Sequence, residues 1–150
     1  LTQNGRQAAR LRVFEFADTA ERFKAGDKRT LSLAALDGAR LNAARKKESV
    51  HLIVSDLPYG VQHAPGGKKG VSLEEMLYDV LPVWTRTLKR GGAMALSFNV
   101  NTLAPDMVRG MMAECGLDVM DEPVYCGLEH WVEQAITRDV AVAVKRYSDD

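Results

Sequence analysis

Residues 50–60 of the chain read Val-His-Leu-Ile-Val-Ser-Asp-Leu-Pro-Tyr-Gly, an apolar run that ends in an acid, a proline, an aromatic residue and a glycine. A short apolar run bounded by turn residues is typical of a buried strand in a parallel sheet. Ligands of open α/β sheets bind just beyond the carboxyl ends of the strands. The sequence therefore predicts an α/β fold with Asp56 and Tyr59 at the ligand-binding edge of the sheet.

The composition is that of an ordinary globular domain. The chain has 150 residues, 46% of them hydrophobic and 27% charged, so residues 1–150 are expected to form one domain with a core. A formal net charge of zero argues against a stand-alone nucleic-acid-binding protein. It does not argue against an enzyme whose docking module for the nucleic acid lies elsewhere. No apolar run approaches the roughly 20 residues that span a bilayer, so no membrane partner is expected.

Cys115 and Cys126 are the only cysteines of the sequence, and they are too few and too unpatterned for a disulfide framework. Free thiols fit a reducing compartment, which predicts a cytoplasmic location. The histidines lack metal-ligand spacing with the cysteines, so no metal site is expected.

The pattern along the chain predicts strands at residues 12–17 and 30–36, either as parallel neighbours or as a long hairpin. Further on, Ser72 and Glu75 have the spacing of a capping box, which predicts a helix that ends at Gly91-Gly92. The sequence alone does not decide whether the strands at 12–17 and 30–36 are parallel neighbours or a long hairpin.

The second half of the chain predicts a strand at residues 93–98 and a helix at about 103–115. Two strands follow, within 117–126 and 135–145, and they are expected to pair antiparallel because no helix separates them. The fold class predicted from these elements is α/β, with a doubly wound, mostly parallel sheet and a terminal antiparallel hairpin.

The segment Asp56-Leu57-Pro58-Tyr59 carries the groups that a methyl transfer to an exocyclic amine needs. The lone pair of such a nitrogen is delocalised into the base, so the amine is a weak nucleophile. A carboxylate from Asp56 and the backbone carbonyl of Leu57 can accept both N–H bonds and aim the lone pair at a methyl donor, while Pro58 stiffens the turn. The ring of Tyr59 can stack on a base flipped out of its helix.

This segment resembles the fourth motif of the amino-group methyltransferases, which is an acid or Asn followed by Pro-Pro and an aromatic residue. The closer resemblance is to the THUMP-associated RNA methylase family, which contains tRNA guanosine-N2 methyltransferases and shows Asp-Leu-Pro-Tyr-Gly-like variants. The resemblance implies an S-adenosylmethionine-dependent methyltransferase that N-methylates an exocyclic amino group of a nucleic-acid base, with RNA favoured over DNA. The sequence departs from the usual motif at Leu57, where proline is replaced but the main-chain carbonyl is kept.

Asp37-Gly38 follows a predicted strand and resembles the acidic segment with which this family binds the adenine amino group of S-adenosyl-L-methionine. The resemblance thus implies that Asp37 and Gly38 bind the cofactor, although Asp-Gly is also an ordinary turn. No Gly-x-Gly-x-x-Gly loop is present. We therefore expect the C-terminal part of a longer chain, without its first strand. Its open sheet edge is expected either to self-associate or to be completed by a preceding segment.

Three further residues are expected to contact the substrate. His63 lies in the loop after the Asp56–Tyr59 segment, and Asn99 follows the strand at 93–98, where it can bind a base or cap the next helix. Trp131 lies in a segment that resembles the terminal hairpin of the family.

Two alternative functions remain. The same chemistry can act on adenine or cytosine of DNA, because the motif does not distinguish the amine. A partial methyltransferase fold can also serve without catalysis, by binding nucleic acid or a partner chain. The missing glycine loop favours this second alternative, and the intact Asp56 and Tyr59 oppose it.

Overall fold

The computed structural model describes residues 2–3, 6–7, 10–59 and 72–147. Two compact units make up the chain, unit 1 over Leu1–Asp37 and unit 2 over Gly38–Asp150. The predicted substrate contact of His63 lies outside the described residues.

Unit 1 consists of two β-hairpins. A short one pairs β1 (Thr2–Gln3) with β2 (Arg6–Gln7), and a longer one pairs β3 (Arg10–Phe16) with β4 (Arg29–Ala35). The single described helix between β3 and β4 is α1 (Ala20–Lys24). Because β3 and β4 are antiparallel, the hairpin is the correct one of the two arrangements that the sequence left open.

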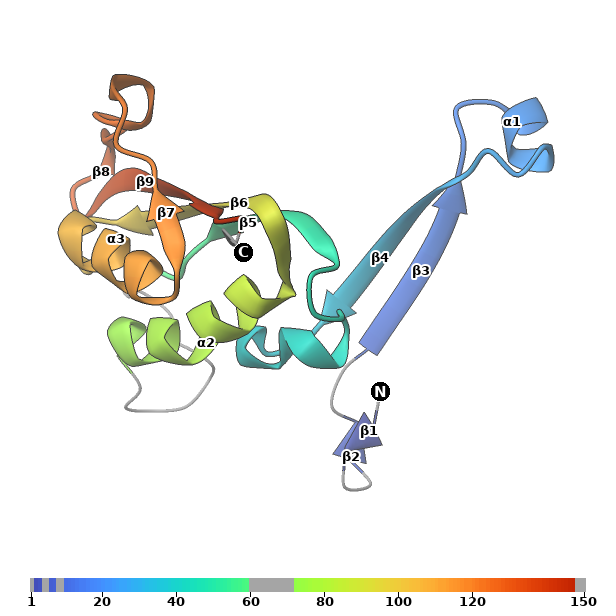
Figure 1. The fold of residues 1–150 in the computed structure, drawn as a ribbon, viewed down its shortest axis with the longest axis horizontal. Coiled ribbons are helices and arrows are strands. Elements are labelled where there is room, and N and C mark those ends of the chain that lie inside the picture. The colour runs from blue at the N-terminus through green and yellow to red at the C-terminus, as the bar shows by residue number, and fades with distance from the viewer. Residues whose placement is uncertain (1, 4–5, 8–9, 60–71, 148–150) are drawn as a thin grey trace. The chain divides into compact units, whose positions relative to one another are not determined.

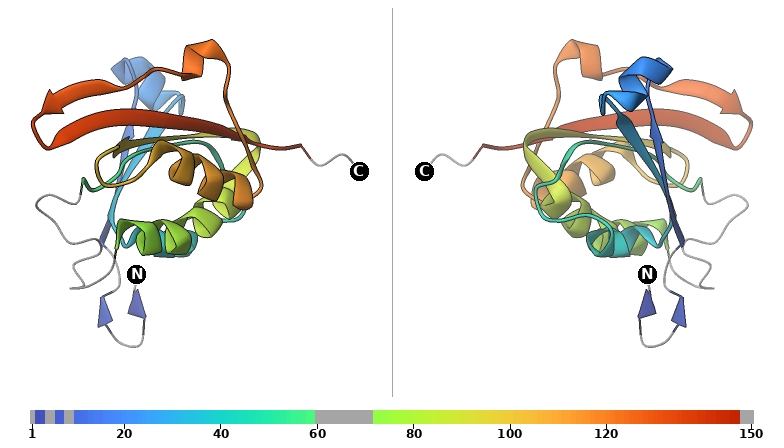
Figure 2. Two further views of the ribbon diagram at one scale, coloured as in Figure 1. Left: turned by 90° about the vertical axis from the view of Figure 1, so that its left-hand side faces the viewer. Right: turned by 90° about the vertical axis from the view of Figure 1, so that its right-hand side faces the viewer.

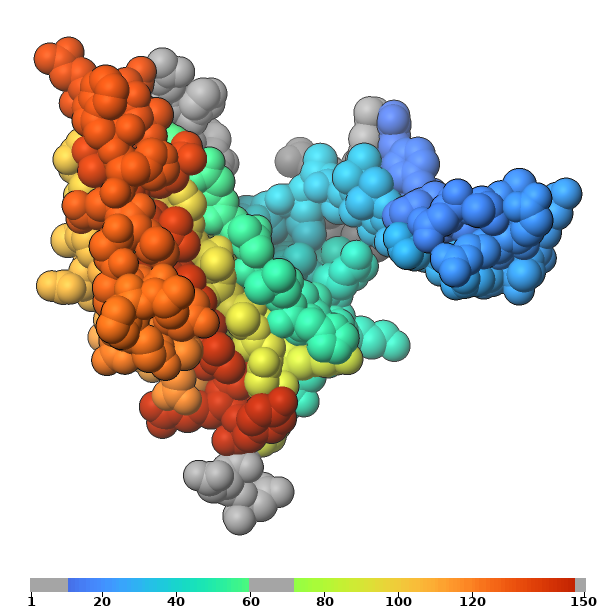
Figure 3. Space-filling view, turned by 90° about the horizontal axis from the view of Figure 1, so that it is seen from above, coloured from blue at the N-terminus to red at the C-terminus, as the bar shows by residue number. Residues whose placement is uncertain are grey.

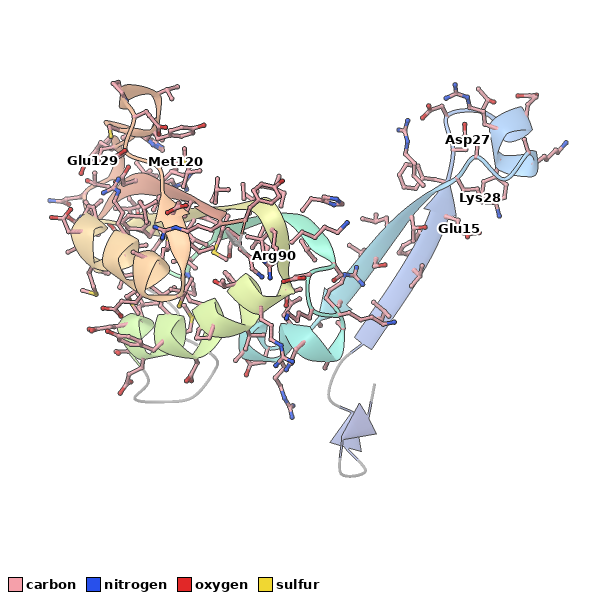
Figure 4. The ribbon with its side chains drawn as sticks, viewed as in Figure 1. Glu15, Asp27, Lys28, Arg90, Met120 and Glu129 are labelled. Carbon is pink, nitrogen blue, oxygen red and sulfur yellow. The ribbon has the colours of Figure 1, made fainter. Side chains whose placement is uncertain are left out.

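None of the described side chains of unit 1 is buried. The amino group of Lys28 and the carboxylate of Glu15 form an ion pair of 3.0 Å that ties the two arms together (Figure 4). Large apolar side chains of both strands are exposed, namely Leu11, Val13, Phe14, Phe16, Leu31 and Leu33. A two-stranded hairpin without a second layer is marginally stable at best.

Unit 2 is built on a five-stranded sheet, which contains the strand order β5–β6–β9–β7 with β8 also paired to β9 (Figure 1). The strands are β5 (Val50–Asp56), β6 (Leu88–Asn99), β7 (Leu117–Val119), β8 (His130–Glu133) and β9 (Ile136–Lys145). In its described residues, β5 has β6 as its one neighbour, so its other edge is open.

The strand directions correct one prediction and confirm another. β5 and β6 are parallel, whereas β9 is antiparallel to β6, β7 and β8. The terminal antiparallel hairpin is thus confirmed, but the described sheet is not mostly parallel. The reason is the connection: β7, β8 and β9 follow one another without a helical crossover, so the chain must turn back on itself.

The helices of unit 2 lie on one side of the sheet (Figure 2). The α-helices on this side are α2 (Leu73–Thr87) and α3 (Pro105–Glu114). Two short 3-10 segments, η1 (Gly38–Ala43) and η3 (Pro123–Tyr125), complete the helical elements of the described residues. The capping box is confirmed, since the Glu75 N–H donates to the Ser72 hydroxyl and the Ser72 N–H donates to the Glu75 carboxylate. No described helix is long and apolar enough to span a membrane.

α2 ends earlier than predicted. Leu88 already belongs to β6, and Gly91-Gly92 lies inside that strand instead of stopping the helix. A Cβ on Gly92 would lie 2.9 Å from the carbonyl oxygen of His51, at the register shift between β5 and β6. The glycine is therefore needed for the close approach of two strands.

The core of unit 2 lies between α2, α3 and one face of the sheet. The apolar side chains of both helices point into it. Its largest fully buried side chains are Phe98, Leu77, Leu81, Leu88, Met94, Leu96, Leu103, Met112, Leu117 and Val108.

The opposite face of the sheet carries no α-helix among the described residues of unit 2. Figure 3 looks onto β5, β6 and β9, whose atoms form adjacent rows. Leu52 and Val54 of β5 are 58% and 71% exposed. The predicted buried strand and doubly wound sheet are thus wrong for the described part of unit 2, because α2 and α3 cover a single face.

Candidate active site

Asp56 and Tyr59 meet at the carboxyl end of β5. Asp56 is the last residue of the strand and is exposed, and its register partner on β6 is Ser97. The Tyr59 hydroxyl donates a hydrogen bond of 2.7 Å to Oδ1 of Asp56. The turn thus folds Tyr59 back over the strand end.

Leu57 anchors this turn. Its N–H donates to the carbonyl oxygen of Ser97 at 2.8 Å, and its side chain is buried in the core. Because the N–H is bonded, the position does not meet the condition under which a proline is tolerated. Pro58, the next residue, is half-buried. The motif is thus anchored by a backbone hydrogen bond and by a side chain in the core.

Arg138 of β9 completes the group. Its guanidinium carbon lies 5.4 Å from the centroid of the Tyr59 ring, within the range of a cation–π contact. Nε of Arg138 and Oγ of Ser97 are buried and have no hydrogen-bond partner of ordinary geometry among the described residues. Sequence reasoning missed both residues as site residues, since strand pairing brings them to Tyr59 from distant positions.

The electrostatics keep the Tyr59 hydroxyl protonated. Partial burial raises the pKa of Tyr59, and the hydrogen bond to Asp56 together with the charge of that carboxylate raises it further. The Ser97 hydroxyl and the Arg138 charge act in the opposite direction. The net shift is upward, so Tyr59 acts as a donor to Asp56 at neutral pH.

The side chain of Asn99 has a structural role in the fold. The side chain is buried, its amide donates to the carbonyl of Ala135, and its Oδ1 accepts the N–H groups of Asn101 and Thr137. These bonds tie the end of β6 to the start of β9. A contact between Asn99 and a base stays a prediction.

Trp131 lies on β8 and is 72% exposed. Its register partner is Thr137, whereas the preceding residue, His130, pairs with Arg138. Neighbouring side chains in a strand point to opposite faces, so His130 and not Trp131 shares the face of Arg138. No described hydrogen bond or ring contact joins Trp131 to Tyr59, and its substrate contact stays a prediction.

The two predicted cofactor residues lie where unit 1 ends and unit 2 begins along the chain. Asp37 is exposed and is the last residue of unit 1, and Gly38 is the first of unit 2. The indole N–H of Trp84 donates to the Gly38 carbonyl at 3.0 Å, and a Cβ on Gly38 would lie 3.2 Å from that ring. Gly38 is thus explained by packing against α2, and cofactor binding by this pair stays a prediction.

No metal site is formed by the described residues, since they contain no group of three His, Cys, Asp or Glu side chains arranged to hold an ion.

No family model and no curated protein matches the chain. Two crystal structures of a Thermus thermophilus protein, whose designation as a DNA modification methylase is itself provisional, match with a TM-score of 0.52 and 17% identity. They cover 75% and 76% of this chain, and 51% and 53% of the Thermus chain. A third structure of that protein, complexed with S-adenosyl-L-methionine, has a TM-score of 0.49 at 18% identity.

The α/β fold of this chain resembles that of the two Thermus structures. The chain spans about half the length of the structures that it matches. The predicted α/β class and its likeness to a methyltransferase structure are thus confirmed, whereas the resemblance to the RNA methylase family stays a prediction.

Proposed function

We propose that this chain carries the amine-positioning half of an S-adenosylmethionine-dependent methyltransferase, which N-methylates an exocyclic amino group of a nucleic-acid base. The observation that carries the proposal is the placement of Asp56 and Tyr59 at the end of β5, joined by the hydrogen bond of 2.7 Å. The methyltransferase fold of the matched structures supports it, because the site lies at a carboxyl strand end.

The geometry gives each group a role. The Tyr59 hydroxyl uses one lone pair of Asp56 Oδ1, which orients the carboxylate and leaves Oδ2 to accept an N–H bond of the amine. The Leu57 carbonyl is the second acceptor in the proposal. When both N–H bonds are accepted, the nitrogen lone pair points away from the protein acceptors and toward the methyl donor. The ring of Tyr59 supplies the stacking surface for the base.

S-Adenosyl-L-methionine would supply an electrophilic methyl group, so that a C–N bond forms as the C–S bond breaks. In this proposal Asp37 is the residue that binds the adenine end of the cofactor, on the resemblance of Asp37-Gly38 to the acidic segment of the RNA methylase family. After transfer, the amine releases one proton, which the carboxylate of Asp56 can accept or pass to water.

Within this function we propose RNA as the substrate class, on the resemblance of the Asp56–Tyr59 segment to the RNA methylase family. DNA is the second candidate, because the matched Thermus protein is designated a DNA modification methylase. Transfer of labelled methyl groups to single-stranded RNA and DNA of the same sequence distinguishes the two.

The substitution that tests the function is Asp56→Ala in the full-length protein. Methyl transfer is expected to be lost while cofactor binding is nearly unchanged, because Asp56 orients the amine and not the donor. Asp56→Asn is expected to retain part of the activity, as the related motifs accept either residue. Asp118→Ala is the matched control, since Asp118 is an acid of β7 that pairs with Arg146 away from the site. Wild-type turnover by Asp56→Ala would reject the proposal.

A non-catalytic function is favoured by one observation, the open edge of β5 with its exposed Leu52 and Val54. Calorimetric titration of the chain with S-adenosyl-L-methionine separates the two classes. We expect weak binding, because the sequence has no glycine-rich loop for the methionine part. Complete absence of binding to the full-length protein would favour the non-catalytic alternative.

A further inference from the structure

The ring of Tyr59 has two faces, and one of them is already in use. The guanidinium of Arg138 lies 5.4 Å from the ring centroid, where the negative face of the aromatic system attracts a cation. A planar guanidinium also stacks on an aromatic ring in a way that an ammonium cannot. Only the other ring face can receive a base as long as this contact persists.

Arg138 is held by a rigid part of the fold. It pairs with Asn99 of β6 on one side and with His130 of β8 on the other, so its backbone belongs to an inner position of the sheet. The buried Nε shows that the stem of the side chain is packed. A loop residue at this position would have far more freedom.

The Tyr59 side chain is thus restrained from three directions. Its hydroxyl is bonded to Asp56, its backbone follows Leu57, whose N–H is bonded to Ser97, and its ring contacts Arg138. These partners come from β5, β6 and β9, so the ring orientation is set before any ligand binds. Such preorganisation removes part of the ordering entropy that binding would otherwise cost.

We propose that Arg138 is a positioning residue of the Asp56–Tyr59 site, which covers one face of the Tyr59 ring and leaves the opposite face as the single stacking surface for the target base. The proposal rests on the proposed function for the identity of the ligand, and on the ring contact alone for the role of Arg138. The base stacks without displacing the guanidinium, so Arg138 acts through Tyr59.

The first test reads the ring contact without any substrate. In protein with tyrosine isotope-labelled at Cζ, NMR follows the ionisation of Tyr59, and the ring current shifts the side-chain protons of Arg138 upfield. Because the cation favours the phenolate, Arg138→Ala is expected to raise the pKa of Tyr59 above that of the native protein. Arg146→Ala is the matched control, since Arg146 pairs with Asp118 away from the ring, and it is expected to leave this titration unchanged.

The second test measures stacking with a single-stranded RNA that carries the fluorescent base 2-aminopurine. Arg138→Ala is expected to weaken binding of this probe about two- to five-fold, the range of an exposed cation–π contact, and to raise KM more than it lowers kcat. Arg138→Lys is expected to recover only part of the loss, because an ammonium lacks the planar stack. The upfield shift of the Arg138 protons should persist when the probe is bound.

The outcomes separate this inference from the proposed function. Methyl transfer that depends on Asp56, with a Tyr59 titration insensitive to Arg138→Ala, would overturn the role of Arg138 and leave the function standing. If Arg138→Ala shifts the Tyr59 titration but Asp56→Ala leaves methyl transfer unchanged, the proposed function is rejected and the role of Arg138 stands. Loss of the upfield shift on probe binding would show that the base displaces Arg138, which overturns the single stacking face. If Arg138→Ala does not fold, the upfield shift of the Arg138 protons in the native protein, with and without the probe, decides whether Arg138 covers the ring face.

Discussion

The hairpin of unit 1 and the sheet of unit 2 both carry alternating apolar side chains, yet only the sheet buries them. Phe14 of β3 is 46% exposed, whereas Phe98 of β6 is fully buried. The difference is the second layer, because α2 and α3 pack on one face of the unit 2 sheet and α1 has no buried residue. A strand pattern therefore becomes a core only where another element covers it. The candidate active site lies on the unit with the core.

The largest effect is expected from a matched pair of phenylalanines. Phe98→Ala should lower the free energy of unfolding of unit 2 by about 3–5 kcal/mol, because it leaves a cavity beneath β6. Phe14→Ala, at a half-exposed position, should change the same transition by no more than about 0.5 kcal/mol. Urea unfolding followed by circular dichroism measures both. Equal losses would mean that the hairpin contributes to the core.

Leu57→Pro tests how the candidate active site depends on the core of unit 2. The substitution removes the N–H bond to Ser97 and a core side chain, so a loss of about 3 kcal/mol or more in unfolding free energy is expected. Leu57→Ala keeps the backbone bond, and the difference between the two variants reports what that bond contributes. Thermal unfolding gives both values. A tolerated proline would show that the turn does not depend on the N–H bond.

Tyr59→Ala should weaken base binding by about 1–3 kcal/mol, the stacking contribution of one aromatic ring. Tyr59→Phe should be milder, since it keeps the ring and loses only the hydrogen bond to Asp56. Phe16→Ala in the unit 1 hairpin is the control and is expected to leave binding unchanged. Fluorescence titration with a 2-aminopurine RNA measures all three. A loss with Phe16→Ala would bring unit 1 into substrate binding.

The smallest effect on stability is expected for Val54→Glu, because Val54 is 71% exposed on the open-edge strand β5. The change should alter the unfolding free energy by less than about 0.5 kcal/mol, while a charge on the edge opposes strand pairing between chains. If the chain self-associates through β5, sedimentation velocity should show more monomer. Val13→Glu, at an exposed position of unit 1, tests the hairpin in the same way. A shift with Val13→Glu alone would place the association in unit 1.

Local patterns were read correctly where neighbours along the chain decide the structure. The capping box of Ser72 and Glu75 involves residues three positions apart, and the structure forms both of its hydrogen bonds. Gly91-Gly92 shows the limit of such patterns. The pair resembles a helix stop, but both residues lie in β6, where Gly92 permits the close approach to β5.

The sequence by itself determined the α/β character, the end of β5 as the candidate site, and the motif that places a carboxylate next to an aromatic ring. Only the tertiary structure decided that one sheet face stays uncovered and that Ser97 and Arg138 join the motif. The physical reason is the range of the interactions. Hydrogen bonds and side-chain contacts within a turn follow from neighbouring residues, whereas strand register brings Arg138 to Tyr59 only after β9 has paired with β6.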